Sequence, residues 1–143
     1  MLSRTGEYAL RAVIHLAQNR NRWPIPGNRI AEEAGVPAKY LSKVLGDLVR
    51  IGVLLSSRGK QGGFRMARPP DKTLLMDVLA PFEQFDERRC PFGGGRCSDQ
   101  APCLAHERWK GVVDAEQRFL RSTTVQDVAG RPPARETGRR RNG

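Results

Sequence analysis

The 143-residue chain has no long apolar segment. No stretch approaches the roughly 18 to 20 consecutive apolar residues of a transmembrane helix. The apolar run at the N-terminus is interrupted by Glu7 and Arg11, which is not typical of a secretory signal. We therefore expect a soluble, cytoplasmic protein with no membrane partner.

Cysteine is scarce, and its number is odd. The three thiols are Cys90, Cys97 and Cys103, all within one glycine-rich stretch. An odd number of cysteines in a chain without a secretory signal disfavours a disulfide framework.

Familiar arrangements of catalytic residues are also missing. No nucleophile with an adjacent base, no phosphate-binding glycine loop and no pair of carboxylates stands out in the sequence. The sequence therefore predicts a protein that is not an enzyme.

Acidic residues are few compared with basic ones, 15 against 25, so the net charge is +10. This excess indicates an anionic partner. It is concentrated in residues 1–68, which hold 12 Lys and Arg against 4 Asp and Glu, whereas residues 69–129 hold 8 against 10. We expect a DNA-binding domain over residues 1–80, a cysteine loop with a dimerisation helix over 81–129, and a basic, disordered tail over 130–143.

The first half has the periodicity of a helix-turn-helix. Apolar residues recur at helical spacing over 5–18, and "NRNRWPIPGN" then breaks the helix. A short helix capped by Asn28, a turn over 35–37 and a second helix over about 38–51 follow. The inward stripe of the second helix comprises Leu41, Val44, Leu45 and Leu48.

A basic hairpin follows directly. The segment "VLLSSRGKQGGFRMARPP" predicts two short strands around a glycine-rich tip, which is typical of a wing. The fold class expected is mainly α, a winged helix-turn-helix with a small β-hairpin wing and a long C-terminal dimerisation helix. The residues expected to contact double-stranded DNA are Lys39, Tyr40, Ser42 and Lys43 on the helix and Arg58, Gly59 and Lys60 at the tip.

The dimerisation helix is expected from about residue 102 to 122. Its apolar stripe comprises Ala105, Trp109, Val112, Val113, Phe119 and Leu120. So long a stripe in a small chain favours a homodimer, and a two-fold dimer presents two recognition helices to a palindromic promoter site.

The cysteine spacing, C-x6-C-x5-C, leaves three kinds of chemistry open. Structural zinc sites usually place two ligands closer together, as in C-x2-C. An iron–sulfur cluster suits thiolates spread along a flexible loop, and a thiol redox switch is the third alternative. Neighbouring Arg88, Arg89 and Arg96 favour the thiolate form.

Four segments in order resemble the Rrf2 family of winged-helix transcription regulators: "GEYALRAVIHLA", "IAEEAGVPAKYLSKVLGDLVRIGVLLSSRGKQGGF", "CPFGGGRCSDQAPCLAHERW" and "STTVQDVA". The resemblance covers residues 1–129, and its most specific parts are the R-G-x-x-G-G tip and the x5 spacing between the last two cysteines. It implies that Cys90, Cys97 and Cys103 ligate an iron–sulfur cluster, [2Fe-2S] slightly favoured over [4Fe-4S]. It also implies a homodimer and a regulator sensing nitric oxide, redox stress or iron–sulfur status.

The fourth ligand is open. His106 follows Cys103 by three residues and resembles the corresponding position in some family members. Glu7 is the alternative, because other members resemble this chain at a carboxylate in the first helix that reaches the partner's cluster. We favour His106. A DNA-binding regulator with a structural zinc or thiol-redox cysteine loop is the alternative function.

Overall fold

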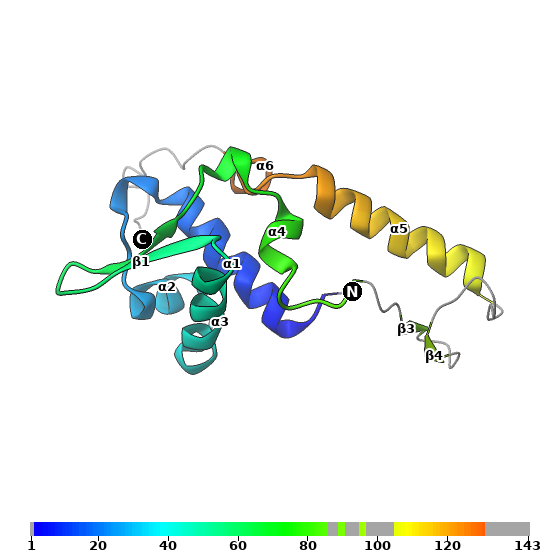
Figure 1. The fold of residues 1–143 in the computed structure, drawn as a ribbon, viewed down its shortest axis with the longest axis horizontal. Coiled ribbons are helices and arrows are strands. Elements are labelled where there is room, and N and C mark those ends of the chain that lie inside the picture. The colour runs from blue at the N-terminus through cyan, green and yellow to red at the C-terminus, as the bar shows by residue number, and fades with distance from the viewer. Residues whose placement is uncertain (1, 86–88, 91–94, 97–104, 131–143) are drawn as a thin grey trace, which may run out of the picture.

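The computed structural model describes residues 2–85, 89–90, 95–96 and 105–130. These residues form an elongated molecule, in which a winged-helix body carries one long helix projecting from its side (Figure 1). In chain order the elements are α1 (Arg4–Gln18), the 3-10 helix η1 (Arg20–Arg22), α2 (Gly27–Ala34), α3 (Ala38–Arg50), β1 (Leu54–Ser57), β2 (Gly63–Met66), the 3-10 helix η2 (Pro70–Lys72), α4 (Leu75–Leu79), β3 (Arg89–Cys90), β4 (Gly95–Arg96), α5 (His106–Ser122) and α6 (Val125–Ala129). The expected mainly α winged helix is thus confirmed.

Helix α1 lies at the centre of the body and packs against α2, α3, α4 and α6. Its apolar face is made mostly of small residues, with Ala9, Ala12, Val13 and Leu16 fully buried. Alanines at these positions let the neighbouring helices approach closely while the whole stripe leaves water. The helix begins at Arg4, one residue before the predicted start.

The turn between α2 and α3 lies where the sequence predicts it, but α2 begins earlier than expected. Pro26, not Asn28, stands at the N-cap, and its carbonyl accepts from the backbone N–H of both Arg29 and Ile30 at 3.0 Å. The prediction that Asn28 caps α2 is therefore wrong. A proline carbonyl can accept the first hydrogen bonds of a helix as well as any other carbonyl. Because α2 begins at Gly27, Asn28 lies within its first turn.

The wing has a third segment that was not predicted from the sequence. Strands β1 and β2 pair antiparallel from Leu54 opposite Met66 to Ser57 opposite Gly63. In addition, Ile25 and Phe64 exchange two backbone hydrogen bonds of 3.0 and 2.9 Å. This bridge joins the tip-side half of β2 to the linker before α2.

The chain returns to the body after α5. The backbone of Leu75 donates to the Thr123 carbonyl at 2.9 Å, and that of Val125 donates to the Thr73 carbonyl at 2.8 Å. These two bonds place α6 against α1, where Val125 and Ala129 join the same hydrophobic core as α1 and α3. The body therefore contains residues from both sides of position 81. The long helix was predicted to start near residue 102, but positions 102–104 lie outside the described residues.

None of the helices in the described ranges has the length and apolarity needed to cross a membrane.

Candidate nucleic-acid interface and cysteine loop

Helix α3 separates an apolar face from a basic one. Leu41, Val44, Leu45 and Leu48 are buried in the core as predicted. Lys39, Ser42 and Lys43 are exposed on the other side, and the Lys43 side chain is 81% exposed. The helix therefore presents its ammonium groups to solvent, as a recognition helix must.

Tyr40 is a large exposed residue beside these lysines. It is 54% exposed. Its ring stacks on Tyr8 of α1, and the Lys39 ammonium lies 5.7 Å from its centroid. Tyr40 is therefore held on the surface in a fixed place by neighbours on two helices.

A hollow of about 610 Å³ adjoins this face between α1, α3 and residues 81–82. Basic and aromatic side chains predominate in its wall. The lining residues are Arg4, Thr5, Tyr8, Lys39, Tyr40, Lys43, Val44, Asp47, Pro81 and Phe82.

Asp47 ties the lysine face to the end of α3. Its carboxylate pairs with Arg50 at 2.8 Å and with Lys43 at 3.5 Å. The hydrogen bond from Arg50 is the main cause of a lowered Asp47 pKa, and the charge of Lys43 adds to it. Asp47 is thereby held in its anionic form and pairs with the exposed Lys43 side chain.

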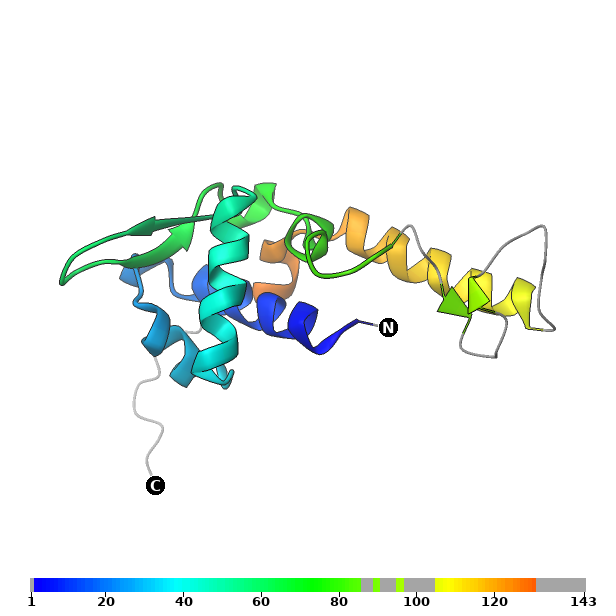
Figure 2. The ribbon, with the colours of Figure 1, turned by 60° about the horizontal axis from the view of Figure 1, so that its bottom comes forward.

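The tip of the wing is basic and exposed. Arg58, Gly59 and Lys60 all lie on the surface, and Gly62 closes the turn through its N–H to the Gly59 carbonyl at 2.9 Å. The hairpin extends past α3 at the end of the molecule opposite α5 (Figure 2). All seven residues predicted to contact DNA are therefore exposed, on α3 and on the wing.

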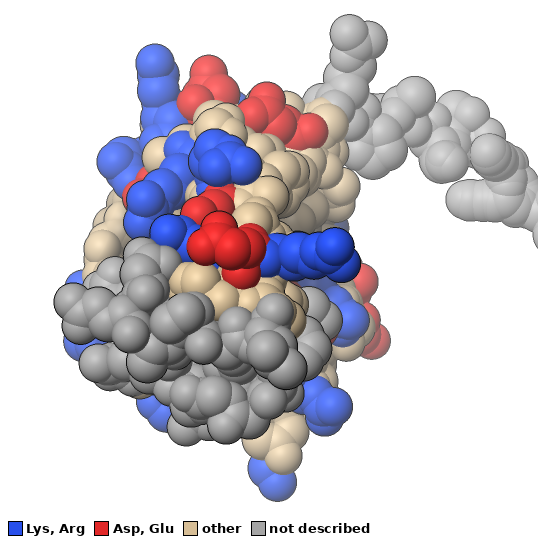
Figure 3. Space-filling model, turned by 90° about the vertical axis from the view of Figure 1, so that its right-hand side faces the viewer, with Lys and Arg blue, Asp and Glu red and all other residues tan. Residues whose placement is uncertain are grey.

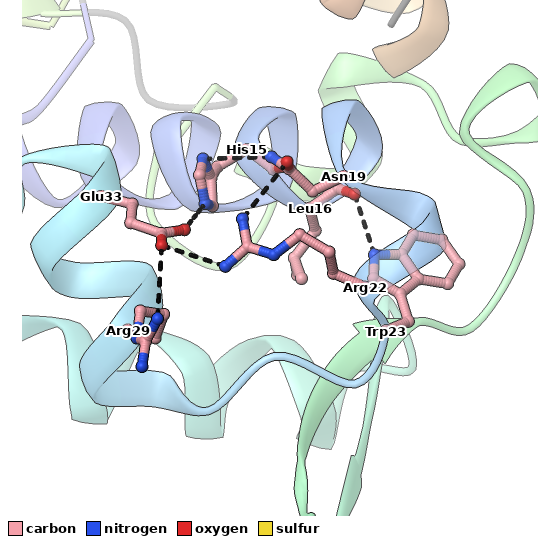
Figure 4. A network of polar contacts seen from close by, with 7 residues as sticks. All are labelled: His15, Leu16, Asn19, Arg22, Trp23, Arg29 and Glu33. Atoms are coloured by element: carbon pink, nitrogen blue, oxygen red, sulfur yellow. Dashed lines mark hydrogen bonds and ion pairs between the residues drawn. The ribbon is translucent and has the colours of Figure 1, made fainter. Parts of the chain in front are cut away.

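A polar network that was not predicted from the sequence joins α1, η1 and α2. Glu33 accepts from Arg22 at 3.0 Å, lies 2.8 Å from His15 Nε2 and 4.0 Å from Arg29 (Figure 4). The Arg22 hydrogen bond is the main cause that lowers the Glu33 pKa. Asn19 adds bonds to the His15 carbonyl at 2.8 Å and from Arg22 at 3.3 Å. These contacts fix the first helix of the helix-turn-helix relative to α1.

Only part of the cysteine loop is described. Strands β3 and β4 form a two-residue antiparallel pair, with Arg89 opposite Arg96 and Cys90 opposite Gly95. Cys97 and Cys103 lie outside the described residues, as does Arg88. Within the described ranges, no three His, Cys, Asp or Glu residues come together as metal ligands would. The predicted cysteine ligands stay a prediction.

The two candidates for a fourth ligand occupy different surroundings. His106 is the first residue of α5 and only 4% exposed. Glu7 lies in the first turn of α1 and is exposed. The imidazole is thus enclosed at the point where the loop enters α5, whereas the carboxylate faces outward.

The apolar residues predicted to form one stripe on α5 differ in their exposure to solvent. Leu120 is buried and Trp109 and Val113 are half-buried, but Val112 is 57% exposed and Phe119 52% exposed. Seen from the α5 end, the described Lys and Arg residues lie among Asp and Glu residues (Figure 3). This end of the molecule therefore combines exposed apolar side chains with charges of both signs, unlike the basic α3 face.

A helix-turn-helix with an exposed basic recognition helix and a basic β-hairpin wing defines a DNA-binding winged-helix protein. The Rrf2 family model, described as an iron-dependent transcriptional regulator, matches residues 2–131. The chain belongs to the Rrf2 family of transcriptional regulators.

Relatives agree with this assignment. The chain is 34% identical over 131 residues to an HTH-type transcriptional regulator of Aquifex aeolicus, covering 90% of each chain. It is 30% identical over 148 residues to the regulator IscR of an Enterobacter species, covering 96% of this chain and 90% of the relative.

Solved structures share the fold. CymR of B. subtilis, described as the global cysteine regulator, aligns with a TM-score of 0.75 at 25% identity, covering 90% of this chain and 95% of CymR. IscR of T. potens aligns with a TM-score of 0.70 at 26% identity, covering 90% and 85%.

Proposed function

We propose that this chain is a homodimeric regulator whose affinity for a palindromic promoter site is controlled by an iron–sulfur cluster. The ligands are Cys90, Cys97 and Cys103, with His106 as the fourth. The observation that carries the proposal is the enclosed imidazole of His106 at the start of α5, three residues after the last cysteine.

The donor set fits such a group. Cysteine thiolates, usually four, are the common ligands of iron–sulfur clusters, and histidine replaces cysteine in some of them. Three cysteines and one histidine therefore supply donors of the right kind and number. The backbone pair of β3 with β4 supports this, since it turns the chain back on itself between Cys90 and the residue before Cys97. When bound, the cluster supplies a centre that reacts with oxidants or nitric oxide. The [2Fe-2S] form is slightly favoured over [4Fe-4S].

Glu7 is the alternative fourth ligand. It is exposed on α1 and therefore available to a partner subunit. His106→Ala is expected to leave a labile or spectrally shifted cluster, and Glu7→Ala does so only if the partner subunit supplies the ligand.

DNA binding is proposed through α3 and the wing. Lys39 and Lys43 suit phosphate oxygens, while Tyr40 and Ser42 suit base edges in the major groove. Arg58, Gly59 and Lys60 approach an adjacent minor groove. Support comes from the exposure of all seven residues and from the excess of positive charge over residues 1–68.

The homodimer is proposed through α5. Val112 and Phe119 lie seven residues apart, about two helical turns, so they share one side of the helix. Both are more than half exposed in the single chain. Joining two copies across this side removes both side chains from water and sets the spacing between the two recognition helices.

The decisive experiment compares the anaerobically purified protein with Cys97→Ala. The wild type is expected to be brown, to contain iron and sulfide, and to bind its operator with an affinity that changes about 5- to 150-fold when the cluster is removed. Cys97→Ala is expected to be colourless and to match the cluster-free wild type. A colourless protein containing zinc supports the structural zinc alternative, and operator binding that responds only to thiol oxidation supports the redox alternative. Either result overturns the cluster.

A further inference from the structure

Ser3 and Glu83 form a clasp between the start of α1 and the segment that leads from α4 to the cysteines. The Ser3 backbone N–H donates to Glu83 Oε2 at 2.9 Å, and the Ser3 hydroxyl donates to the same oxygen at 2.6 Å. The two residues are 80 positions apart in the chain. We call this pair the Ser3–Glu83 clasp.

The clasp is built into the first turn of α1. Ser3 is the N-cap of this helix, and its hydroxyl accepts from the Gly6 N–H at 3.0 Å. A Cβ at Gly6 would collide with Glu83 Oε2 and lie 3.1 Å from Leu79 Cδ2. Glycine at this position is what lets the carboxylate approach the helix end, where a negative charge is favoured by the helix dipole.

The other side of the clasp is continuous with α4. The Glu83 N–H donates to the Leu79 carbonyl at 3.1 Å, which extends the last turn of α4 to the carboxylate. Glu83 stands seven residues before Cys90 in the chain. Phe85, between the two, packs against the core and accepts from Gln117 Nε2 of α5 at 3.3 Å, and Glu83 bonds the start of α1. A movement of this segment that shifts Glu83 therefore acts on the first turn of α1.

The clasp also lies next to the DNA-facing surface. Arg4 follows Ser3, and Phe82 precedes Glu83, and both line the hollow that Tyr40 and Lys43 of α3 complete. Tyr8, one turn beyond the clasp on α1, stacks on Tyr40 with ring centroids 6.3 Å apart. A shift of the first turn of α1 thus changes the packing against the recognition helix.

We infer that the Ser3–Glu83 clasp transmits the state of the cysteine loop to α3, with Glu83 acting as a positioning residue. The inference rests on the proposed function, because it requires that the cluster controls operator affinity. The described hydrogen bonds of Glu83 are to Ser3 and to Leu79. Glu83 fixes the position of α1 relative to the segment that enters the loop.

The test measures operator affinity in the cluster-loaded and cluster-free forms of the full chain, by fluorescence anisotropy, and takes their ratio. Glu83→Ala removes both hydrogen bonds that Glu83 accepts from Ser3. The wild-type affinity ratio is expected to lie at a typical coupling of about 5- to 150-fold, and the ratio of Glu83→Ala is expected to be about threefold or more lower. Glu83→Gln is expected to retain most of the wild-type ratio, because a single oxygen accepts both bonds and an amide still provides one. Gln84→Ala, at the exposed neighbouring position, is the matched control and should leave the ratio unchanged.

A second measurement does not depend on the cluster. Hydrogen exchange of the cluster-free protein should be faster in the first turn of α1 for Glu83→Ala than for the wild type. Ser3→Ala removes the hydroxyl bond to Glu83 but keeps the backbone bond, and it also removes the cap on the Gly6 N–H. Its exchange should therefore be faster than in the wild type, while its affinity ratio should fall less than that of Glu83→Ala.

The outcomes separate the two proposals. If exchange is faster in Glu83→Ala but the ratio stays at the wild-type value, the clasp only caps α1 and transmission is wrong. Unchanged exchange means that the clasp does not hold α1, and this also overturns the inference. A wild-type ratio of one refutes control by the cluster, and the clasp inference falls with it.

Discussion

Tyr8 of α1 and Tyr40 of α3 stack with their ring centroids 6.3 Å apart and their planes inclined by 24°. Tyr40 is 54% exposed despite this contact, so one face of its ring rests on the body while the rest is open to a partner. A residue that is both exposed and immobilised by packing binds at a lower entropic cost than a free side chain.

Removing the support should therefore weaken DNA binding without removing a DNA contact. Aromatic pairs contribute about 0.5–1.5 kcal/mol beyond the area they bury, so we expect Tyr8→Ala to raise the operator Kd by about 2- to 10-fold. Tyr8→Phe keeps the ring and should bind like the wild type. Equal affinities for Tyr8→Ala and the wild type would show that Tyr40 needs no support from α1.

Lys43→Ala and Arg58→Ala should weaken operator binding without unfolding the protein, because both side chains are exposed. If Lys43 contacts only phosphate, its loss lowers affinity similarly on all sequences and reduces the slope of log K against log salt by about one unit. Titrations at several salt concentrations measure this. Lys72→Ala, an exposed lysine of η2 away from α3, is the control. Unchanged binding by both test variants would exclude docking through α3 and the wing.

Val112→Asp tests the dimer. Val112 is 57% exposed in the single chain, so the aspartate should not disturb the folded monomer. In a dimer joined through this side of α5, however, it buries a charge without a partner, which costs several kcal/mol. Sedimentation should show monomers, and specific operator binding should be lost with the dimer. Arg121→Ser, on the opposite side of α5, should remain dimeric, and a tight dimer of Val112→Asp would place the interface elsewhere.

The Glu33 network predicts a pH dependence of stability. The pKa of the Glu33 carboxyl is lowered from 4.5, mainly by the hydrogen bond from Arg22 and to a smaller extent by His15. Arg29 also faces the carboxylate. A carboxyl group whose pKa is lower in the folded state contributes stability above its unfolded pKa and loses it as the pH falls through the folded value. Glu33→Gln should therefore be less stable than the wild type at pH 7, by up to about 1 kcal/mol for such a surface cluster.

The difference in stability between Glu33→Gln and the wild type should disappear as the pH falls below 4.5 and through the lowered pKa of Glu33 in the folded state. Urea denaturation at a series of pH values measures it. A difference that persists in acid would assign the effect of Glu33→Gln to altered packing and not to charge.

A feature of this fold can be predicted from the sequence when the residues that form it are close together in the chain. The stripe of Leu41 and Leu48 and the glycine-rich wing tip follow from local periodicity and turn preferences, so α3 and the tip of the wing are predicted to within about a residue. The bridge of Ile25 to Phe64 joins segments far apart in the sequence and has no local signature. The same holds for the Ser3–Glu83 clasp.

The candidate site is predictable in kind but not in arrangement. Thiol spacing and neighbouring arginines indicate which donors are available, because ligand type follows from residue type. The burial of His106 and the exposure of Glu7 depend on how α1 and α5 pack, which no spacing encodes. The sequence therefore could not predict these different surroundings, and the proposal of His106 over Glu7 stays a prediction.

Two glycines provide the last prediction, because replacing each with alanine is expected to change the stability of the protein in opposite directions. Gly63 of β2 has φ +157, and a Cβ there would collide with the Ile25 carbonyl group and lie 2.7 Å from the Pro26 nitrogen. Gly63→Ala must push the linker away and weaken the Ile25–Phe64 bridge, so we expect a loss of about 1–3 kcal/mol, as for other overpacked sites. A Cβ at Gly46 of α3 would meet no neighbouring segment within 4 Å, and the backbone there is helical. Gly46→Ala should stabilise the protein by about 0.5–1 kcal/mol through the lower backbone entropy of its unfolded state. Thermal unfolding followed by circular dichroism separates the two, and a Gly63→Ala variant as stable as Gly46→Ala would mean that the linker is not held against the wing.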